Sequence, residues 1–425
     1  MKNKKALYLL LSANAVSGMA QGISMLAIPW YFADVLKQSS SFGIMYGTAT
    51  ILSLFWGLYV GTLIDKYSRK NIFLTISIVG TLFIGSIAAF GFYNGGLSAI
   101  SIGAVFCYTM FVYNIHYPTL YAFGQEISDK KDYRKINSLI EVQGQSTSII
   151  AGALAAILIT GINTDFLAKL GLENFDFLLI EPWKMHEIFL LDAVTYALAL
   201  GLISLIKYEK NFIETMNSGN IFNRLKSGFS YLKEHPLIFH FGVGSFAIFV
   251  IVLIHIHQLL PIYISNHLKQ DASIYASAEV LQALGALSAG LGIHRVFMKT
   301  NTIKAIIILM SLAIITLIVL VFTKNHIVLI ISCFVLGLTN SGSRIMRVTY
   351  LFNHIPNNII GRTGSVFQSI NIFLRFIFIG IFSLAFFSKE NNIIWTYFIG
   401  AGFILLSLYP LLFYYKRLIN LKQPD

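Results

Sequence analysis

Long apolar stretches, each able to cross a lipid bilayer as a helix, follow one another along almost the whole chain. A membrane-spanning helix needs about 20 mainly apolar residues, and hydrocarbon leaves its backbone polar groups no partners outside the segment. Charged residues are 12% of the chain, about half of their share in soluble proteins. We therefore predict an all-α membrane protein with about twelve transmembrane helices, at 6–33, 42–64, 71–91, 97–120, 138–161, 187–206, 237–262, 273–294, 302–322, 326–346, 362–387 and 392–415.

Positive charges are concentrated in alternate connections between these stretches. Cations gather on the cytoplasmic side of a membrane, so this pattern places both termini in the cytoplasm. The net charge of +12 then reflects topology and some attraction to anionic lipid, and it gives no reason to expect nucleic acid as a partner. The opposite connections contain few basic residues, namely Lys37, Lys169, Lys184, Lys269, Lys324 and Lys389.

The basic N-terminus and the apolar run after it could be taken for a secretory signal. The run is too long for that and lacks a small-residue cleavage site, which indicates an uncleaved first helix. Cys107 and Cys333 fall inside predicted helices, so we expect neither a disulfide nor a metal site. No cofactor is expected, and the lack of a nucleophile elbow or phosphate loop argues against an enzyme.

The longest predicted cytoplasmic connection, 207–236, divides the chain into halves at 1–206 and 237–425. Within it, Phe222, Leu225, Phe229 and Leu232 share one helical face and cations cover the rest. This pattern predicts an amphipathic helix in the membrane interface that tethers the halves. The external loop 162–185 is too polar to span a membrane, and we expect it to form a short surface helix.

A short charged turn joins the second and third predicted spans, Gly61-Thr-Leu-Ile-Asp65-Lys66-Tyr-Ser-Arg69-Lys70. A glycine lets membrane helices approach closely, and a carboxylate at a helix end can accept hydrogen bonds from a neighbouring helix or a cation. We expect this turn to contact the start of the eleventh span near Arg362, in a latch that forms in only one conformation. The latch residues would be Gly61, Asp65, Lys66, Arg69 and Arg362.

The turn resembles the signature loop of the major facilitator superfamily, Gly-x-Leu-x-Asp-Arg-x-Gly-Arg-Lys. Further segments resemble its drug-efflux branch, which includes macrolide-efflux-like and enterobactin-exporter-like proteins. The resemblance implies two six-helix halves, alternating access and a bacterial inner membrane. The segments are Ile28-Pro-Trp30-Tyr, Arg134-Lys-Ile-Asn137-Ser138-Leu139, Phe189-Leu-Leu-Asp192-Ala-Val-Thr-Tyr196 and Gly228-Phe-Ser-Tyr231-Leu-Lys-Glu-His-Pro236.

The sequence also departs from the family's patterns. Ser68 stands where the loop motif has glycine, the fourth span lacks the arginine linked to proton coupling, and the fifth lacks the Gly-Pro pair of antiporters. Proton antiport therefore follows from analogy and is not encoded by these motifs.

Ionisable side chains inside spans are costly and indicate function. Glu279, about two turns from the predicted outer end of its span, could exchange protons or pair with a neighbouring helix. Asp34 and Asp192 near outer helix ends could be caps or proton sites. His255 and His257 diverge by about 200° around their helix, which argues against zinc but leaves either as a proton relay. The proton-coupling candidates are Glu279, Asp34 and His255.

Arg375 is the basic residue placed deepest in a span. It could bind an anionic substrate or pair with Glu279 or another carboxylate. Arg347, near a predicted cytoplasmic end, is expected to extend toward the interface. Asn14, Ser17, Gln21 and Ser24 recur at helical spacing and are assigned to the transport cavity. The full set of cavity candidates is Asn14, Gln21, Asn114, His116, Gln282, Arg344, Gln368 and Arg375.

Together these features predict a monomeric carrier that exports an amphiphilic or anionic small molecule in exchange for protons. Its partners would be that molecule, protons and the lipid bilayer. Two alternatives stay open: transport of a siderophore or carboxylate-rich metabolite in either direction, and a non-transporting sensor or scaffold of the same fold.

Overall fold

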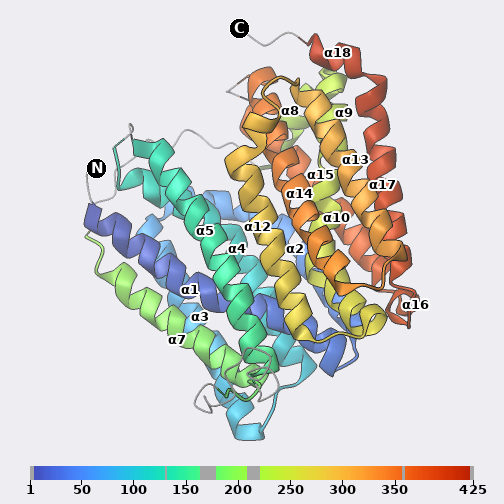
Figure 1. Ribbon diagram of the computed structural model, residues 1–425. Coiled ribbons are helices and arrows are strands. Elements are labelled where there is room, and N and C mark those ends of the chain that lie inside the picture. Colours follow the sequence, from blue (N-terminus) through green and yellow to red (C-terminus); the bar gives the residue numbers. More distant parts are fainter. Residues whose placement is uncertain (1–3, 130–131, 163–178, 208–220, 357–358, 422–425) are drawn as a thin grey trace. The chain divides into compact units, whose positions relative to one another are not determined.

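The computed structural model describes residues 4–129, 132–162, 179–207, 221–356 and 359–421. This part of the chain is almost entirely helical (Figure 1). Its only β-type pairing is an isolated bridge between Ile162 and Ile180. The predicted surface helix of the loop 162–185 falls mostly outside the described residues.

The all-α membrane architecture is confirmed. Eleven described stretches are long and apolar enough to cross a membrane, and α2 is a further helix of 28 residues. The N-terminal helices are α1 (Lys4–Trp30), continued by the π-helical turn η1 (Tyr31–Val35), then α2 (Ser39–Lys66), α3 (Arg69–Asn94), α4 (Ala99–Glu126), α5 (Tyr133–Thr160) and α7 (Met185–Ser204).

The C-terminal helices begin after α8 (Ile221–Glu234). One long interrupted helix is made of α9 (Pro236–Ser245), α10 (Ala247–Ile254), η4 (His255–Leu259), α11 (Leu260–Ile262) and η5 (Tyr263–Leu268). It is followed by α12 (Ala272–Val296), α13 (Thr302–Phe322), α14 (His326–His354), α15 (Ile360–Phe382), α16 (Ala385–Ser388), α17 (Ile394–Phe413) and α18 (Tyr415–Ile419).

Side-chain caps explain where several helices begin. The side chain of Ser68 accepts a hydrogen bond from the backbone N–H of Asn71 at the start of α3, and Ser98 does the same for Ser101 in α4. Asn301 caps α13 in the same way. Such caps satisfy backbone donors that have no partner within the helix, so these short polar turns can separate long apolar helices.

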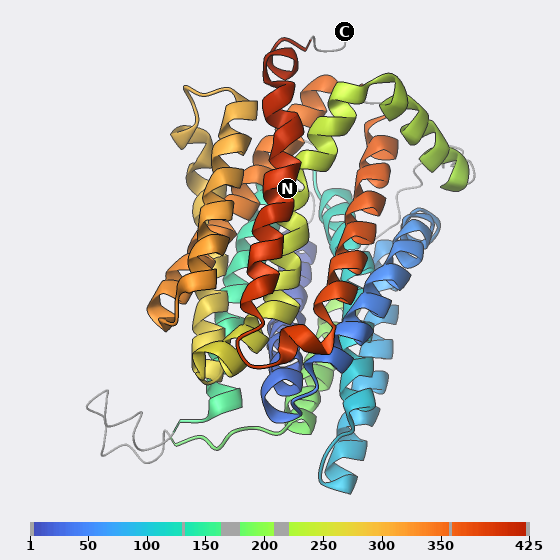
Figure 2. The ribbon, with the colours of Figure 1, turned by 90° about the vertical axis from the view of Figure 1, so that its right-hand side faces the viewer.

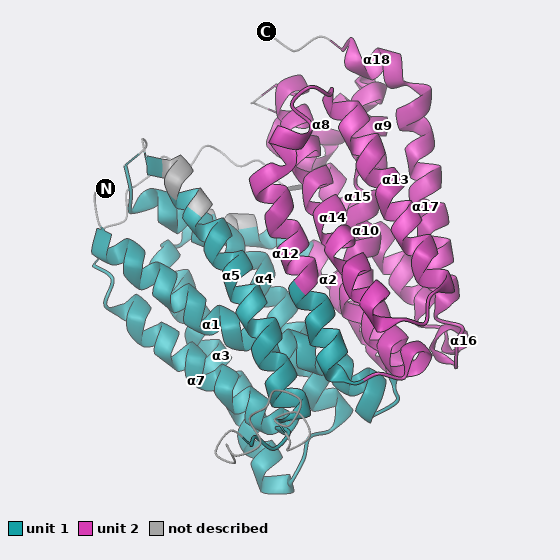
Figure 3. Ribbon diagram, in the orientation of Figure 1, with its two compact units in different colours: residues 1–38, 55–215, 271–280 teal, residues 39–54, 216–270, 281–425 magenta. Residues whose placement is uncertain are grey.

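The helices form two compact units (Figure 3). Unit 1 contains residues 1–38, 55–215 and 271–280, and unit 2 contains 39–54, 216–270 and 281–425. Each unit thus takes one short helical segment from the opposite half of the sequence: the first part of α2 packs in unit 2, and the first part of α12 packs in unit 1.

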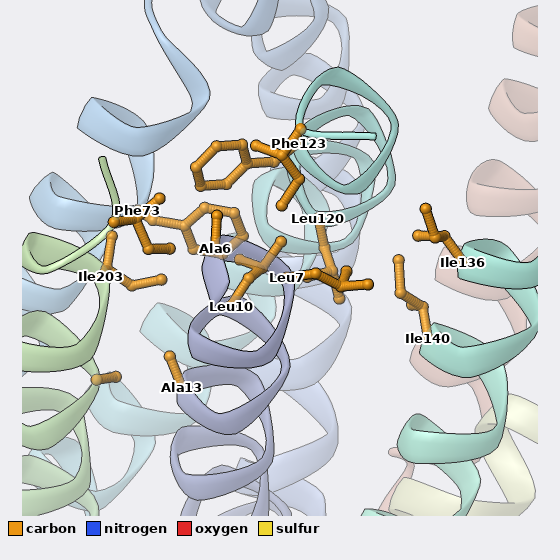
Figure 4. Close-up of a cluster of buried hydrophobic side chains, with 13 residues drawn as sticks. Ala6, Leu7, Leu10, Ala13, Phe73, Leu120, Phe123, Ile136, Ile140 and Ile203 are labelled. Carbon is orange, nitrogen blue, oxygen red and sulfur yellow. The ribbon is translucent and has the colours of Figure 1, made fainter. Parts of the chain in front are cut away.

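In unit 1, the ends of five helices meet in an apolar cluster around Phe73 and Phe123 (Figure 4). Next to it, α1, α3 and α7 pack side by side (Figure 1). A Cβ at Gly80 of α3 would lie 2.7 Å from the ring of Tyr196 in α7, so the glycine permits this close approach. The cluster consists of Ala6, Leu7, Leu10, Ala13, Phe73, Leu120, Phe123, Ile127, Ile136, Ile140, Ala199, Ile203 and Ile206.

In unit 2, α8 lies at an angle across one end of the bundle (Figure 2) and packs on α15. Leu232 of α8 is 1% exposed and Leu225 packs with the same apolar cluster, whereas Phe229 is 55% exposed. The predicted amphipathic helix therefore exists, with only part of its apolar face covered. Its position in the membrane interface stays a prediction.

The crossing of α12 and α14 depends on two glycines, Gly285 and Gly337. A Cβ on either would collide with a backbone carbonyl of the other helix, that of Phe334 or Gln282. We expect Gly285→Leu to lower the thermal unfolding midpoint in detergent clearly, because overpacking costs about 1–3 kcal/mol. Gly290→Leu is the control in the same helix, since nothing lies within 4 Å of its added Cβ. Equal midpoints for the two variants would contradict this view of the crossing.

Candidate functional site in the buried polar groups

The charged turn between α2 and α3 is held by contacts within unit 1. Arg69 is 9% exposed, and its Nε lies 3.5 Å from Oε2 of Glu126 at the end of α4. The Nζ of Lys70 donates to the carbonyls of Ser204 and Ile206, at 2.9 and 2.7 Å. Ser204 ends α7 and Ile206 follows it, and a cation is favourable at the C-terminal end of a helix. Sequence reasoning missed Glu126, although an acidic residue at the end of an apolar span was a usable signal.

The predicted latch between Asp65 and Arg362 stays a prediction, because the side chain of Asp65 lies outside the described part. Within unit 2, Nη1 of Arg362 lies 3.4 Å from Oγ of Ser227 in α8. Lys66 is exposed, with its Nζ 5.5 Å from the ring centre of Tyr67.

The polar residues of α1 face the interior of unit 1. Oδ1 of Asn14 lies 2.7 Å from Nε2 of His116 in α4, so the structure brings two of the predicted cavity residues together. Gln21 is 1% exposed, and its Nε2 has no hydrogen-bond partner among the described residues. Asn114 instead donates to the carbonyl of Met110 in its own helix, at 2.9 Å.

Glu279 lies in the part of α12 that belongs to unit 1. Its side chain is half-buried, and Oε1 is a buried acceptor without a hydrogen bond in the part of the chain described here. One turn earlier, Tyr275 stacks on Trp30 of α1 at 5.7 Å between ring centres. Asp34 differs from Glu279, because it forms a partly exposed ion pair with Lys37 at 3.0 Å.

Arg375 is the central polar residue of unit 2. It is 8% exposed in α15, lies within hydrogen-bonding reach of the Tyr46 hydroxyl and is 6.0 Å from the ring centre of Phe249. Its Nε has no partner among the described atoms, and neither has either amide atom of Asn371, one turn earlier. The segments of unit 2 that span the membrane contain no aspartate or glutamate.

Two other predicted residues of unit 2 are packed into its interior. His255 is fully buried, with Nδ1 3.0 Å from the Tyr397 hydroxyl and Nε2 3.6 Å from Sγ of Cys333. Gln282 is 5% exposed and its Oε1 has no partner among the described groups. By contrast, the side chains of Arg344 and Gln368 are exposed.

The expectation that Arg347 extends toward the interface is wrong. Arg347 is 3% exposed, its Nη1 donates to the carbonyl of Ser245 at 2.8 Å, and its guanidinium carbon lies 3.6 Å from the ring centre of Phe246. Ser245 ends α9, so the arginine supports the interruption between α9 and α10. The pair Gly244-Ser245 is a sequence signal for such an interruption, but the sequence could not show that Arg347 donates to it.

An apolar cavity of about 630 Å³ lies in unit 1 between α2, α3 and α4. Nε1 of Trp56 donates to the carbonyl of Phe111 at 2.9 Å and fixes the indole in its wall. Sequence reasoning missed this cavity, because the residues that line it have the same apolar composition as residues that face lipid. The lining residues are Trp56, Leu63, Tyr67, Asn71, Ile72, Thr75, Ile76, Val79, Tyr108, Phe111, Val112 and Ile115.

The family model described as Major Facilitator Superfamily matches residues 10–379. The chain belongs to the major facilitator superfamily. It is therefore a multi-pass membrane protein of a transporter family rather than an enzyme, as expected from the charged turn and the apolar spans. No protein with a curated description matches the sequence.

Solved structures of other major facilitators share the fold. The chain is 14% identical to the nucleoside transporter NupG, with a TM-score of 0.68 over 97% of this chain and 99% of that one. A bacterial homologue of the lysosomal transporter Spinster, inward-facing and unoccupied, gives 11% identity and a TM-score of 0.73 over 99% of both chains.

A bacterial homologue of the iron transporter ferroportin, in an inward-facing state, gives 14% identity and a TM-score of 0.67, over 96% of this chain and 98% of that one. At such identities the similarity establishes the fold of this major facilitator, and its substrate has to be argued from its own residues.

Proposed function

We propose that this major facilitator is a secondary active transporter that works by alternating access and exports an amphiphilic or anionic small molecule in exchange for protons. The observation that carries the proposal is a difference between the units in the charged residues within their spanning helices. Glu279 and Asp192 are acidic groups within the helices of unit 1. The spanning segments of unit 2 contain arginines, among them Arg375, but no acidic residue.

The isolated position of Arg375 supports an anionic substrate. A buried guanidinium is stable only with a counter-charge or several acceptors, and unit 2 offers the Tyr46 hydroxyl. An incoming carboxylate, sulfonate or phosphate would accept hydrogen bonds from Nε of Arg375 and from the Asn371 amide, both unpaired among the described residues. Phe249 would contact the apolar part of such a molecule.

The cavity between α2, α3 and α4 supports the amphiphilic character of the substrate. Its volume of about 630 Å³ is within the usual range of small-molecule sites. The segments that resemble the drug-efflux branch favour export across a bacterial inner membrane, with both termini of the chain in the cytoplasm.

The deciding experiment is solute flux and proton movement in proteoliposomes with an imposed pH gradient, using a panel of amphiphilic drugs and carboxylate siderophores. Gradient-driven flux of an anionic or amphiphilic compound, with opposite proton movement, is the expected result. Flux of a carboxylate siderophore, in either direction, would favour the alternative, transport of such a metabolite, which Arg375 would equally bind. Binding of a compound without any flux would favour a sensor or scaffold.

A further inference from the structure

A second buried carboxyl group lies inside unit 1, on a different helix from Glu279. Asp192 of α7 is 0% exposed. Its Oδ2 accepts a hydrogen bond from Oγ of Ser24 in α1 at 2.9 Å. Its Oδ1 is also buried, and it has no hydrogen-bond partner among the described residues. One oxygen of the carboxyl group is therefore hydrogen-bonded, and the other has no hydrogen-bond partner among the described residues.

The titratable groups that face Asp192 are phenols. Tyr108 and Tyr113 of α4 and Tyr196 of α7 are close enough to interact with it electrostatically. The other two helices packed around it contribute none, since α1 has no titratable residue between Tyr8 and Tyr31 and α3 has none between Lys70 and Tyr93. The ion pairs found among described residues, Lys37–Asp34 and Arg69–Glu126, lie elsewhere.

A small cavity with both polar and apolar lining residues lies next to this group. It measures about 10 Å³, which is about the space needed for one water molecule. Tyr196, one helical turn after Asp192, lines it, and its hydroxyl has no partner in the described structure. Asn14 and His116, which contact each other, line it as well, together with Ser17 and Ser77.

An ionised carboxylate in this position would lack both a cation and a full set of donors. Burying such a charged group in an apolar interior costs several kcal/mol. The surroundings of Asp192 therefore suit only the neutral carboxylic acid. We infer that Asp192 binds a proton inside unit 1, as a proton site separate from Glu279. Tyr196 and the water-sized cavity connect it to the His116–Asn14 pair. Hydronium gives its proton to Oδ1 and becomes water, and the reverse step restores the carboxylate.

This inference rests on the proposed exchange of substrate for protons, so its first test is independent of transport. The infrared spectrum of the purified protein at neutral pH should contain the carbonyl stretching band of a protonated carboxylic acid. We expect Asp192→Asn to remove this band and Glu279→Gln to retain it. Ser24→Ala keeps the carboxyl group but deletes its one hydrogen-bond donor, so it should shift the band. A spectrum without the band, or a band unchanged in Asp192→Asn, would overturn the inference.

The second test concerns the use of the proton. In proteoliposomes with a pH gradient, Asp192→Asn should lower gradient-driven substrate flux at least tenfold, and Ser24→Ala should shift the pH at which flux is half-maximal. Should Asp192→Asn fail to fold, Ser24→Ala still tests the site. Wild-type protein with the infrared band but without proton-driven flux would refute the proposed function alone. Normal gradient-driven flux in Asp192→Asn would refute the role of Asp192 in coupling.

Discussion

Arg375→Gln should weaken binding of the anionic substrate about 10- to 150-fold, because a hydrogen bond to a charged partner contributes about 1.5–3 kcal/mol. Arg375 is a buried cation of unit 2 that lies beside the Tyr46 hydroxyl, and His257 is close enough to interact with it electrostatically. Its loss would remove the positive charge that a carboxylate or phosphate needs inside the bilayer. Binding of the identified substrate to purified protein, measured by titration calorimetry, checks this result.

Two matched variants separate substrate binding from a structural role of Arg375. Arg375→Lys keeps the charge but loses the planar donor geometry, and should fall between wild type and Arg375→Gln. Tyr46→Phe removes only the hydroxyl that lies beside the guanidinium, and should bind the substrate nearly normally. An uncharged analogue of the substrate should bind to all of these variants with similar affinity. Equal affinity of wild type and Arg375→Gln for the anion would refute the anion site.

Much of the fold could be predicted from the sequence. Bilayer thickness sets the length of a spanning helix, and the apolar runs in the sequence have that length. The caps Ser68 and Ser98 lie in the polar turns between those runs, where a sequence pattern is informative. Residues 39–54 belong to unit 2 and residues 271–280 to unit 1. The sequence could not predict this, because it depends on which helices each segment packs against.

The site could be predicted only as a list of polar residues. Hydropathy identifies Asn14, His116 and Arg375 as unusual inside spans, but it cannot say which partners they meet. Arg347 shows the consequence, since a cation near a span end usually reaches water, yet here it bonds the carbonyl of Ser245. Asp192 was visible as a residue near a helix end. Its isolation among tyrosines and one serine comes from four helices packing together.

Glu279→Gln should abolish gradient-driven flux, at least a hundredfold below wild type, while purified protein keeps the affinity for substrate within about threefold, or about 0.7 kcal/mol. Glutamine matches the shape of glutamic acid but cannot release a proton, so a coupled cycle would stop at this step. Oε1 of Glu279 is buried without a partner among the residues described, which suits a group that must alternate between two protonation states.

The control for Glu279→Gln is Asp34→Asn, because Asp34 forms a partly exposed ion pair with Lys37 and such pairs contribute little. We expect Asp34→Asn to retain most of the gradient-driven flux. Proton movement recorded with a pH-sensitive dye inside the vesicles should disappear together with substrate flux in Glu279→Gln. Flux that still follows the pH gradient in this variant would exclude Glu279 from coupling. Flux indifferent to the gradient in wild type as well would indicate a uniporter or another driving ion.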